Sequence, residues 1–127
     1  MKVDHIGLAT NTVEDGLALW RDVLGLEVDT TEEIAEQGVR VAMLAIGDTH
    51  VELLEPLSPE SPVAKFISKR GPGIHHIAVE VKDIRASLAE FKQRGARLKY
   101  APKVFAYRFT AAISSVVPGL SEITTFL

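Results

Sequence analysis

The sequence predicts an α+β protein built from paired βαβββ modules that form curved mixed sheets around a cleft. Three observations support this prediction: an internal repeat, a helical apolar stripe after each repeated strand, and a proline-rich connector between the two halves. A unit of this size cannot cover both faces of its own sheet, whereas two copies side by side can share a core. With 127 residues, the chain is expected to form one domain.

The repeat consists of two short segments with the same pattern. Residues 4–9 read Asp-His-Ile-Gly-Leu-Ala, and residues 75–80 read His-His-Ile-Ala-Val-Glu. Both run polar-His-Ile-small-apolar, which is typical of a short buried strand. His5 and His76 therefore occupy equivalent positions, near the start of the first strand in each module.

A helix is expected after each of these strands. Thr12 can cap the first helix, which has acidic residues in its first turn, and Asp83 can cap the second. Gly25 and Gly95 follow the two helices, since glycine accepts the positive φ that commonly ends a helix. Apolar residues at helical spacing mark the buried face of each helix. They are Val13, Leu17, Trp20 and Leu24 in the first helix, and Ile84, Leu88 and Phe91 in the second.

Three further strands are expected after each helix. They are residues 26–30, 39–46 and 50–55 in the first module and 97–100, 107–113 and 120–127 in the second. Tight turns are expected at residues 47–49 and 117–119, which contain glycine.

A connector separates the two halves. Residues 56–62 contain three prolines, each of which lacks a backbone donor and restricts the residue before it. A short helix is expected over residues 63–69, ended by the Arg-Gly-Pro-Gly sequence that follows. We therefore place module one at about residues 1–56, the linker at 57–72 and module two at about 73–127.

Composition excludes several classes of protein. The net charge is −3 and no basic run occurs, so nucleic acid is not an expected partner. With 46% hydrophobic and 24% charged residues, the chain is expected to be globular rather than disordered. It has no cysteine, which excludes disulfides, zinc–thiolate sites and a cysteine nucleophile. No stretch has the length of a signal peptide core or a membrane span, so we expect no membrane association and a cytoplasmic location.

Two histidines and two glutamates occupy matching positions in the modules. Glu52 lies on the last strand of module one and Glu122 on the last strand of module two, beside the equivalent pair His5 and His76. Imidazole and carboxylate ligands suit zinc, cobalt, nickel, manganese or iron. We therefore predict a metal site of these four residues, which makes the cleft metal-containing. His75 points to the other side of the pleat and is not expected to be a ligand.

Each of these residues also has a structural explanation. A single histidine in an apolar strand is more often a packed or hydrogen-bonded core residue, and a strand glutamate is more often solvated. The equivalence of the two histidines under the repeat favours the ligand interpretation. An ion at such a site acts as a Lewis acid, which can polarise a carbonyl and stabilise an enolate.

Six segments between residue 3 and about residue 100 share the pattern of one known family. They are residues 4–7, 36–39, 47–49, 51–57, 61–66 and 73–78. In these segments the sequence resembles the methylmalonyl-CoA epimerases, which belong to the vicinal oxygen chelate superfamily together with glyoxalase I. Membership of the superfamily alone does not determine the reaction.

The resemblance implies a metal-dependent isomerase that interconverts the R and S forms of methylmalonyl-CoA. It implies a divalent ion (cobalt, alternatively zinc, nickel or manganese), an acyl-CoA substrate and a homodimer. The four ligands carry over by position, and the carboxylate of Glu122 would also be the catalytic base that removes the C2 proton. A second acidic residue of some members falls at Val41, which cannot transfer a proton.

The segment from about residue 104 to residue 121 departs from the family pattern, because the glycine-rich loop and a His-Pro-Lys sequence are absent. Two alternatives therefore stay open. One is a glyoxalase I-like isomerase (lactoylglutathione lyase) acting on a glutathione hemithioacetal, against which the connector at residues 56–62 argues. The other is a non-catalytic small-molecule-binding module on the same fold, which the altered tail supports.

Overall fold

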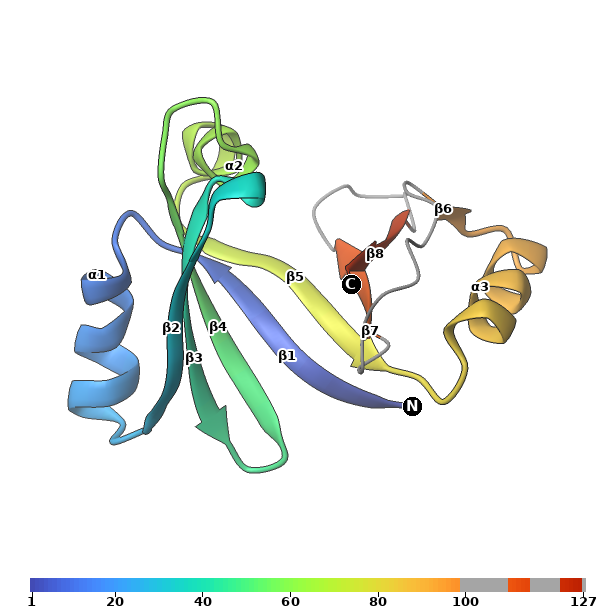
Figure 1. The fold of residues 1–127 in the computed structure, drawn as a ribbon, viewed down its shortest axis with the longest axis horizontal. Coiled ribbons are helices and arrows are strands. Elements are labelled where there is room, and N and C mark those ends of the chain that lie inside the picture. Colours follow the sequence, from blue (N-terminus) through green and yellow to red (C-terminus); the bar gives the residue numbers. More distant parts are fainter. Residues whose placement is uncertain (99–109, 115–121, 127) are drawn as a thin grey trace. The chain divides into compact units, whose positions relative to one another are not determined.

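The structure of the protein is a computed structural model that describes residues 1–98, 110–114 and 122–126 (Figure 1). Its elements follow the βαβββ order twice, with one helix between the two copies. The α+β class and the paired modules are therefore confirmed. By contacts, residues 5–75 form one compact unit, and residues 1–4 with 76–127 form the other.

The strands of residues 5–75 form a mixed sheet in the order β2-β3-β4-β1. β2 pairs with β3 and β3 with β4 in antiparallel fashion, whereas β1 runs parallel to β4. A parallel neighbour needs a crossover connection, and the helical segment after β1 supplies it. The bounds are β1 Lys2–Ala9, β2 Val28–Ile34, β3 Val39–Ile46 and β4 Thr49–Pro56.

One face of this sheet is covered by α1 (Val13–Leu17) and the π-helix η1 (Ala18–Val23), which lie beside β2 and β3 in Figure 1. Thr12 caps α1 as predicted, its hydroxyl accepting from the Asp15 amide at 3.1 Å. The core between helix and sheet consists of Val13, Leu17, Ala42, Leu44, Val51 and Leu53.

The predicted apolar stripe of the first helix is correct for three residues and wrong for the fourth. Val13 and Leu17 are buried, and Trp20 packs against them, but Leu24 is 54% exposed. The reason is the π-helical turn, in which the Leu24 amide donates to Leu19 five residues back. The wider turn changes the 3.6-residue period, and Leu26 packs against the core instead.

The opposite face of the same sheet is covered by α2 (Pro62–Arg70), at the top of Figure 1. Ser61 caps it, accepting from the Val63 amide at 3.2 Å, and Pro62 occupies its first turn. Its buried contacts form a second apolar cluster with the sheet. The cluster contains Ala9, Val39, Val41, Leu54 and Val63, with Ile34, Met43, Phe66 and Ile67 at its margin.

The second module has the same helix arrangement on its first strand. Asp83 caps α3 (Ile84–Gln93) by accepting from the Ala86 amide at 3.0 Å. Ile84 and Leu88 are buried against Val79 of β5 (Gly73–Glu80), with Phe91 at the margin. The predicted stripe of this helix is therefore confirmed, and Gly95 follows it with φ +92°.

The later strands of the second module pair differently from those of the first. β5 pairs antiparallel with β7 (Thr110–Ser114), and β6 (Arg97–Leu98) runs parallel to β8 (Glu122–Phe126). In the first module the corresponding first strand pairs parallel with the last one. Within the described residues, the two modules therefore share the βαβββ order of their main elements but differ in strand pairing.

Most predicted boundaries agree with the structure to within a few residues. β2 begins two residues later than predicted, because the Leu26 amide still bonds to Trp20 at the helix end, at 3.0 Å. The predicted turn at 117–119 lies outside the described residues. Within the part of the chain that the structure describes, no helix has the length and apolar character needed to cross a bilayer.

Candidate metal centre

His5 projects from β1 on the face of the sheet opposite to α1. Leu8 of the same strand packs against the α1 core, whereas Ala9 belongs to the α2 cluster. Since side chains alternate along a strand, His5 lies on the same face as Ala9. Its side chain is 12% exposed.

Glu52 lies on the neighbouring strand β4 and on the same face as His5. Its cross-strand neighbours are Gly7 on β1 and Met43 on β3. Because Gly7 has no side chain, the β1 residue that pairs with Glu52 does not obstruct the Glu52 carboxylate. The Glu52 Oε2 lies 3.4 Å from the His5 Nε2, and the Glu52 side chain is 15% exposed.

His76 lies on β5, two residues before Ala78, and is 6% exposed. Val79 of the same strand packs against α3, so alternation places His76 on the face away from that helix. His5 and His76 thus each face away from the helix of their own module, so the two equivalent residues also have equivalent orientations. The neighbouring His75 ring instead contacts Phe66, with ring centroids 4.9 Å apart in an edge-on arrangement.

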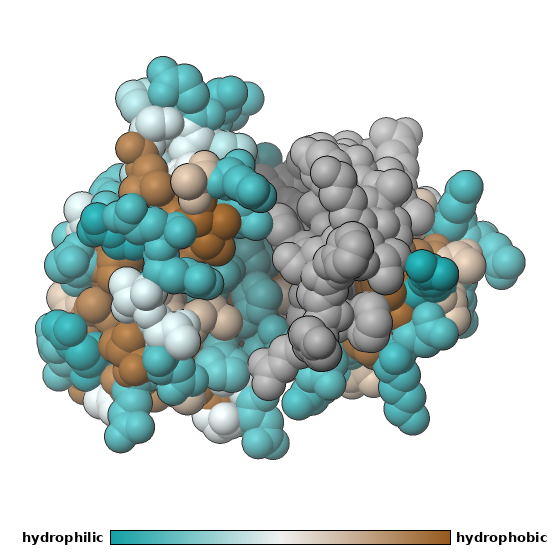
Figure 2. All heavy atoms as spheres, in the orientation of Figure 1, coloured by the Kyte–Doolittle hydropathy of each residue, from teal (hydrophilic) through white to brown (hydrophobic). Residues whose placement is uncertain are grey.

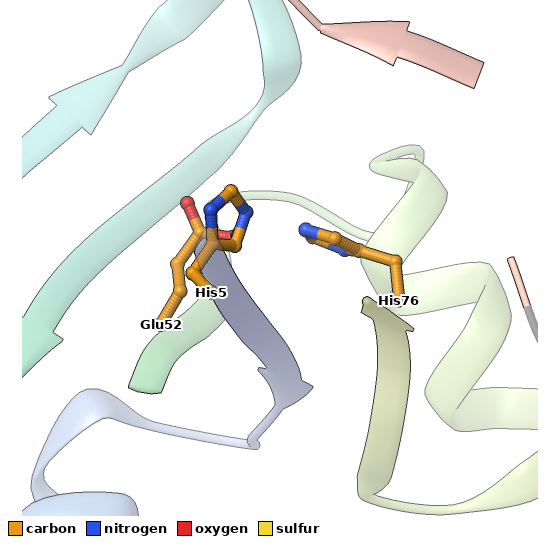
Figure 3. Close-up of side chains that lie close together, drawn as sticks. All are labelled: His5, Glu52 and His76. Atoms are coloured by element: carbon orange, nitrogen blue, oxygen red, sulfur yellow. Dashed lines mark ion pairs between the residues drawn. The ribbon is translucent and has the colours of Figure 1, made fainter. Parts of the chain in front are cut away.

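The three side chains form one cluster, shown in Figure 3. His5, Glu52 and His76 each offer one ligand atom, and these atoms all lie within 4.8 Å of one another. Two imidazoles and a carboxylate are a donor set that suits a divalent transition metal. Low exposure shields the donors from competing water, so the residues fit a divalent ion.

Glu122, the predicted fourth ligand and catalytic base, is the first residue of β8. Its backbone pairs with Ser114 of β7 and with Arg97 of β6. Glu52, by contrast, pairs with Gly7, two residues after His5. Among the described residues, the strand pairing that brings Glu52 to His5 is therefore not repeated between β8 and β5. The role of Glu122 stays a prediction.

Val41, the position of the second acid in some family members, is 2% exposed. It faces Leu54 across the β3–β4 pair and packs in the cluster under α2. An ionised side chain at this position would be buried among apolar groups without a partner, which is costly. The residue therefore serves packing beside the metal cluster.

Glu55 has a structural role at the start of α1. Its Oε2 accepts from the Val13 amide at 2.8 Å, at the first residue of α1, and its Oε1 lies 3.7 Å from Arg40. The hydrogen bond from Arg40 to Glu33 and the charge of Glu55 raise the pKa of the Arg40 guanidinium. No local pattern could reveal Glu55, because it caps a helix 42 residues away in sequence.

Comparison with known proteins agrees with this geometry. The family model described as "Glyoxalase/Bleomycin resistance protein/Dioxygenase superfamily" matches residues 4–110. The ethylmalonyl-CoA/methylmalonyl-CoA epimerase of Cereibacter sphaeroides is 38% identical over 98 residues, covering 76% of this chain and 73% of that protein. The human mitochondrial methylmalonyl-CoA epimerase is 34% identical over 97 residues, covering 76% of this chain. The match spans only 55% of the human protein's length.

Solved structures show the same relationship. A Streptomyces coelicolor methylmalonyl-CoA epimerase variant in complex with 2-nitronate-propionyl-CoA aligns with a TM-score of 0.81 at 33% identity, covering 98% of this chain and 93% of that chain. A methylmalonyl-CoA epimerase in complex with methylmalonyl-CoA and NH4+ aligns with a TM-score of 0.80 at 34% identity, covering 98% of this chain and 92% of that chain. The chain therefore belongs to the glyoxalase/bleomycin resistance protein/dioxygenase superfamily, and within it to the family of the methylmalonyl-CoA epimerases.

Proposed function

We propose that this protein is a metal-dependent isomerase that interconverts the R and S forms of methylmalonyl-CoA. The observation that carries the proposal is the cluster of His5, Glu52 and His76 in a chain of this family. The two epimerases with related structures, one with methylmalonyl-CoA and one with a propionyl-CoA analogue in the complex, support an acyl-CoA substrate.

His5, Glu52 and His76 would hold the ion, with cobalt as the first candidate and zinc, nickel or manganese as alternatives. When bound, a divalent ion supplies a Lewis acid that withdraws electron density from a substrate carbonyl oxygen. The chain's own contribution is to fix two imidazoles and one carboxylate on three strands. Because these three side chains are largely buried, access of water to the site is also limited.

We further propose Glu122 as the fourth ligand and as the base. Its carboxylate would accept the proton that leaves C2, and the electron pair of the broken C–H bond would pass toward the carbonyl oxygen. Return of a proton to the opposite face of C2 completes the inversion. Val41 cannot supply that proton, so the donor is another group.

Deuterium incorporation at C2 tests the proposal directly. Methylmalonyl-CoA incubated in D2O with cobalt-loaded protein should gain one deuterium at C2, which mass spectrometry would detect. Treatment of the protein with EDTA should abolish this gain. Substitutions His5→Ala, Glu52→Ala and His76→Ala should each lower the affinity for the metal by at least the roughly tenfold to hundredfold that loss of an outer-shell partner causes. Absence of exchange with fully metal-loaded protein would exclude the epimerase function.

Matched variants separate the parts of the proposal. His75→Asn changes the histidine next to His76 and should retain one bound ion and exchange. Glu122→Gln tests the base: exchange should fall by at least roughly a hundredfold while His5, Glu52 and His76 still bind metal. Turnover of the methylglyoxal–glutathione hemithioacetal, without exchange at C2 of methylmalonyl-CoA, would instead indicate the glyoxalase reaction. Binding of a small molecule by metal-free protein would indicate a binding module.

Two further predictions from the sequence belong to this proposal. We propose that the protein is a homodimer, which sedimentation velocity would test. We also propose a cytoplasmic location, which fractionation of the source cells would test.

A further inference from the structure

The helix α2 carries a local positive charge on an acidic chain. Lys65, Lys69 and Arg70 are all exposed, and no Asp or Glu occurs between Ser61 and Val79. The chain as a whole has 17 acidic against 14 basic residues. Hydrophilic side chains gather over α2 at the top of Figure 2. None of the three cations forms an ion pair with a carboxylate of the described residues.

The same helix borders the sheet face that carries Glu52 and His5. Val63 is buried against Leu54 of β4, two residues after Glu52 and on the same face. Phe66 lies next in the helix to Lys65 and touches the His75 ring. The inner side of α2 is therefore fixed beside the metal cluster, while Lys65 and Lys69, one turn apart, point a pair of ammonium groups to solvent.

We propose that Lys65 and Lys69, with Arg70, bind the phosphates at the nucleotide end of the acyl-CoA substrate. The inference rests on the proposed function, which places the acyl end at His5, Glu52 and His76. Coenzyme A carries a 3′-phosphate and a diphosphate on its adenosine, joined to the thioester by a flexible pantetheine arm. Lysine offers a point charge and arginine a bidentate fork to phosphate oxygens.

Exposure decides which kinetic parameter these cations control. Contacts between exposed charges are screened by salt and are individually weak, so they act on substrate capture rather than on the chemical step. Cations in the last turn of a helix also interact favourably with its dipole. That structural role would alter stability but would not distinguish a substrate with phosphates from one without them.

The test is the double variant Lys65→Glu/Lys69→Glu, assayed with methylmalonyl-CoA and with methylmalonyl-pantetheine, which lacks the nucleotide. We expect KM for methylmalonyl-CoA to rise roughly fivefold to tenfold, with kcat unchanged. KM for methylmalonyl-pantetheine should stay constant. Added NaCl should raise the wild-type KM for methylmalonyl-CoA and affect the variant less.

A matched control places the same charge change on another helix. Arg85→Glu/Lys92→Glu on α3 alters two exposed cations and should leave both KM values unchanged. Equal increases in the two double variants would show general electrostatics and overturn the proposal. Equal increases for the two substrates, or no increase, would also overturn it.

Direct binding separates this inference from the proposed function. Adenosine 3′,5′-bisphosphate should bind the wild-type protein in calorimetry and bind the Lys65→Glu/Lys69→Glu variant several-fold more weakly. Nucleotide binding without any C2 exchange would support the phosphate site on α2 and reject the epimerase function. C2 exchange without this difference in bisphosphate binding would support the epimerase function and reject the phosphate site on α2.

Discussion

At the scale of single residues, the cluster of His5, Glu52 and His76 depends on the residues that neighbour its members in the sheet. Glu52 can approach His5 because its neighbour on β1 is Gly7, so no side chain on that strand separates them. On the other side of the sheet, Leu53 is fully buried under α1. The alternation of a buried leucine and a ligand along β4 gives Glu52 its direction.

Glu55 provides a prediction at this scale. Glu55→Ala removes the acceptor of the Val13 amide at the start of α1 and a charge beside Arg40. We expect a loss of about 1–2 kcal/mol in the free energy of unfolding, measured by urea denaturation. Glu33→Ala, the control, removes only an exposed partner of Arg40 and should cost less than about 1 kcal/mol. Equal losses in the two variants would contradict the capping role.

At the scale of elements, each module places its histidine and its helix on opposite faces of the first strand. α1 covers the face of Leu8 and Leu53, and α3 covers the face of Val79. The close approach of α1 to β4 requires Gly16, where a Cβ would lie 2.6 Å from the Leu53 Cδ1. Helix packing therefore reaches the residue next to Glu52.

Gly16→Ala tests this approach. Alanine favours a helix over glycine by about 1 kcal/mol, but the added methyl overlaps a fully buried leucine. We expect a net loss of about 1–3 kcal/mol in stability, read from the urea midpoint. Ser68→Ala on the exposed side of α2 should change stability by no more than about 0.5 kcal/mol. A stabilised Gly16→Ala protein would show that Leu53 can move aside.

The π-helical turn gives a second prediction for this element. Leu17→Ala empties a buried position and should cost about 2–5 kcal/mol. Leu24→Ala changes a residue that is 54% exposed and should cost less than about 1 kcal/mol. Chemical denaturation of both variants measures the difference. A regular α-helix through residue 24 would make the two costs comparable.

At the scale of the whole molecule, the modules share an element order but not a strand pairing. The first module joins its first strand to its last in parallel, whereas β5 pairs with β7. The proposed ligands His5, Glu52 and His76 all lie within residues 5–76. Metal binding is therefore expected to depend on the first module and β5, whereas Glu122, the base we propose, lies outside this range.

Metal addition should stabilise the folded chain as a whole. An ion that binds only the folded state, present at a hundred times its Kd, contributes about 2.7 kcal/mol, which raises Tm by roughly 10 °C for a chain of this size. Thermal melts followed by circular dichroism, with cobalt and with EDTA, would measure the shift. Glu52→Ala should lose most of it and His75→Asn should keep it. An equal shift in Glu52→Ala would place the ion elsewhere.

The sequence by itself predicted the element order and singled out His5, Glu52 and His76, which the structure places in one cluster. Strand alternation and helical spacing are local, so residues such as Ile84 and Leu88 could be placed on a buried face without coordinates. The internal repeat then identified His5 and His76 as equivalent. The caps at Thr12 and Asp83 were likewise predictable from residue type and position.

Only the tertiary structure decided what depends on distant contacts. The π-turn that exposes Leu24, the capping of α1 by Glu55 and the pairing of β5 with β7 each join groups far apart in sequence or break a local period. The position of α2 beside Glu52, with Lys65 and Lys69 turned outward, is of the same kind. Local sequence patterns indicate which face of an element is apolar. Which other element packs against that face depends on the packing of the whole chain.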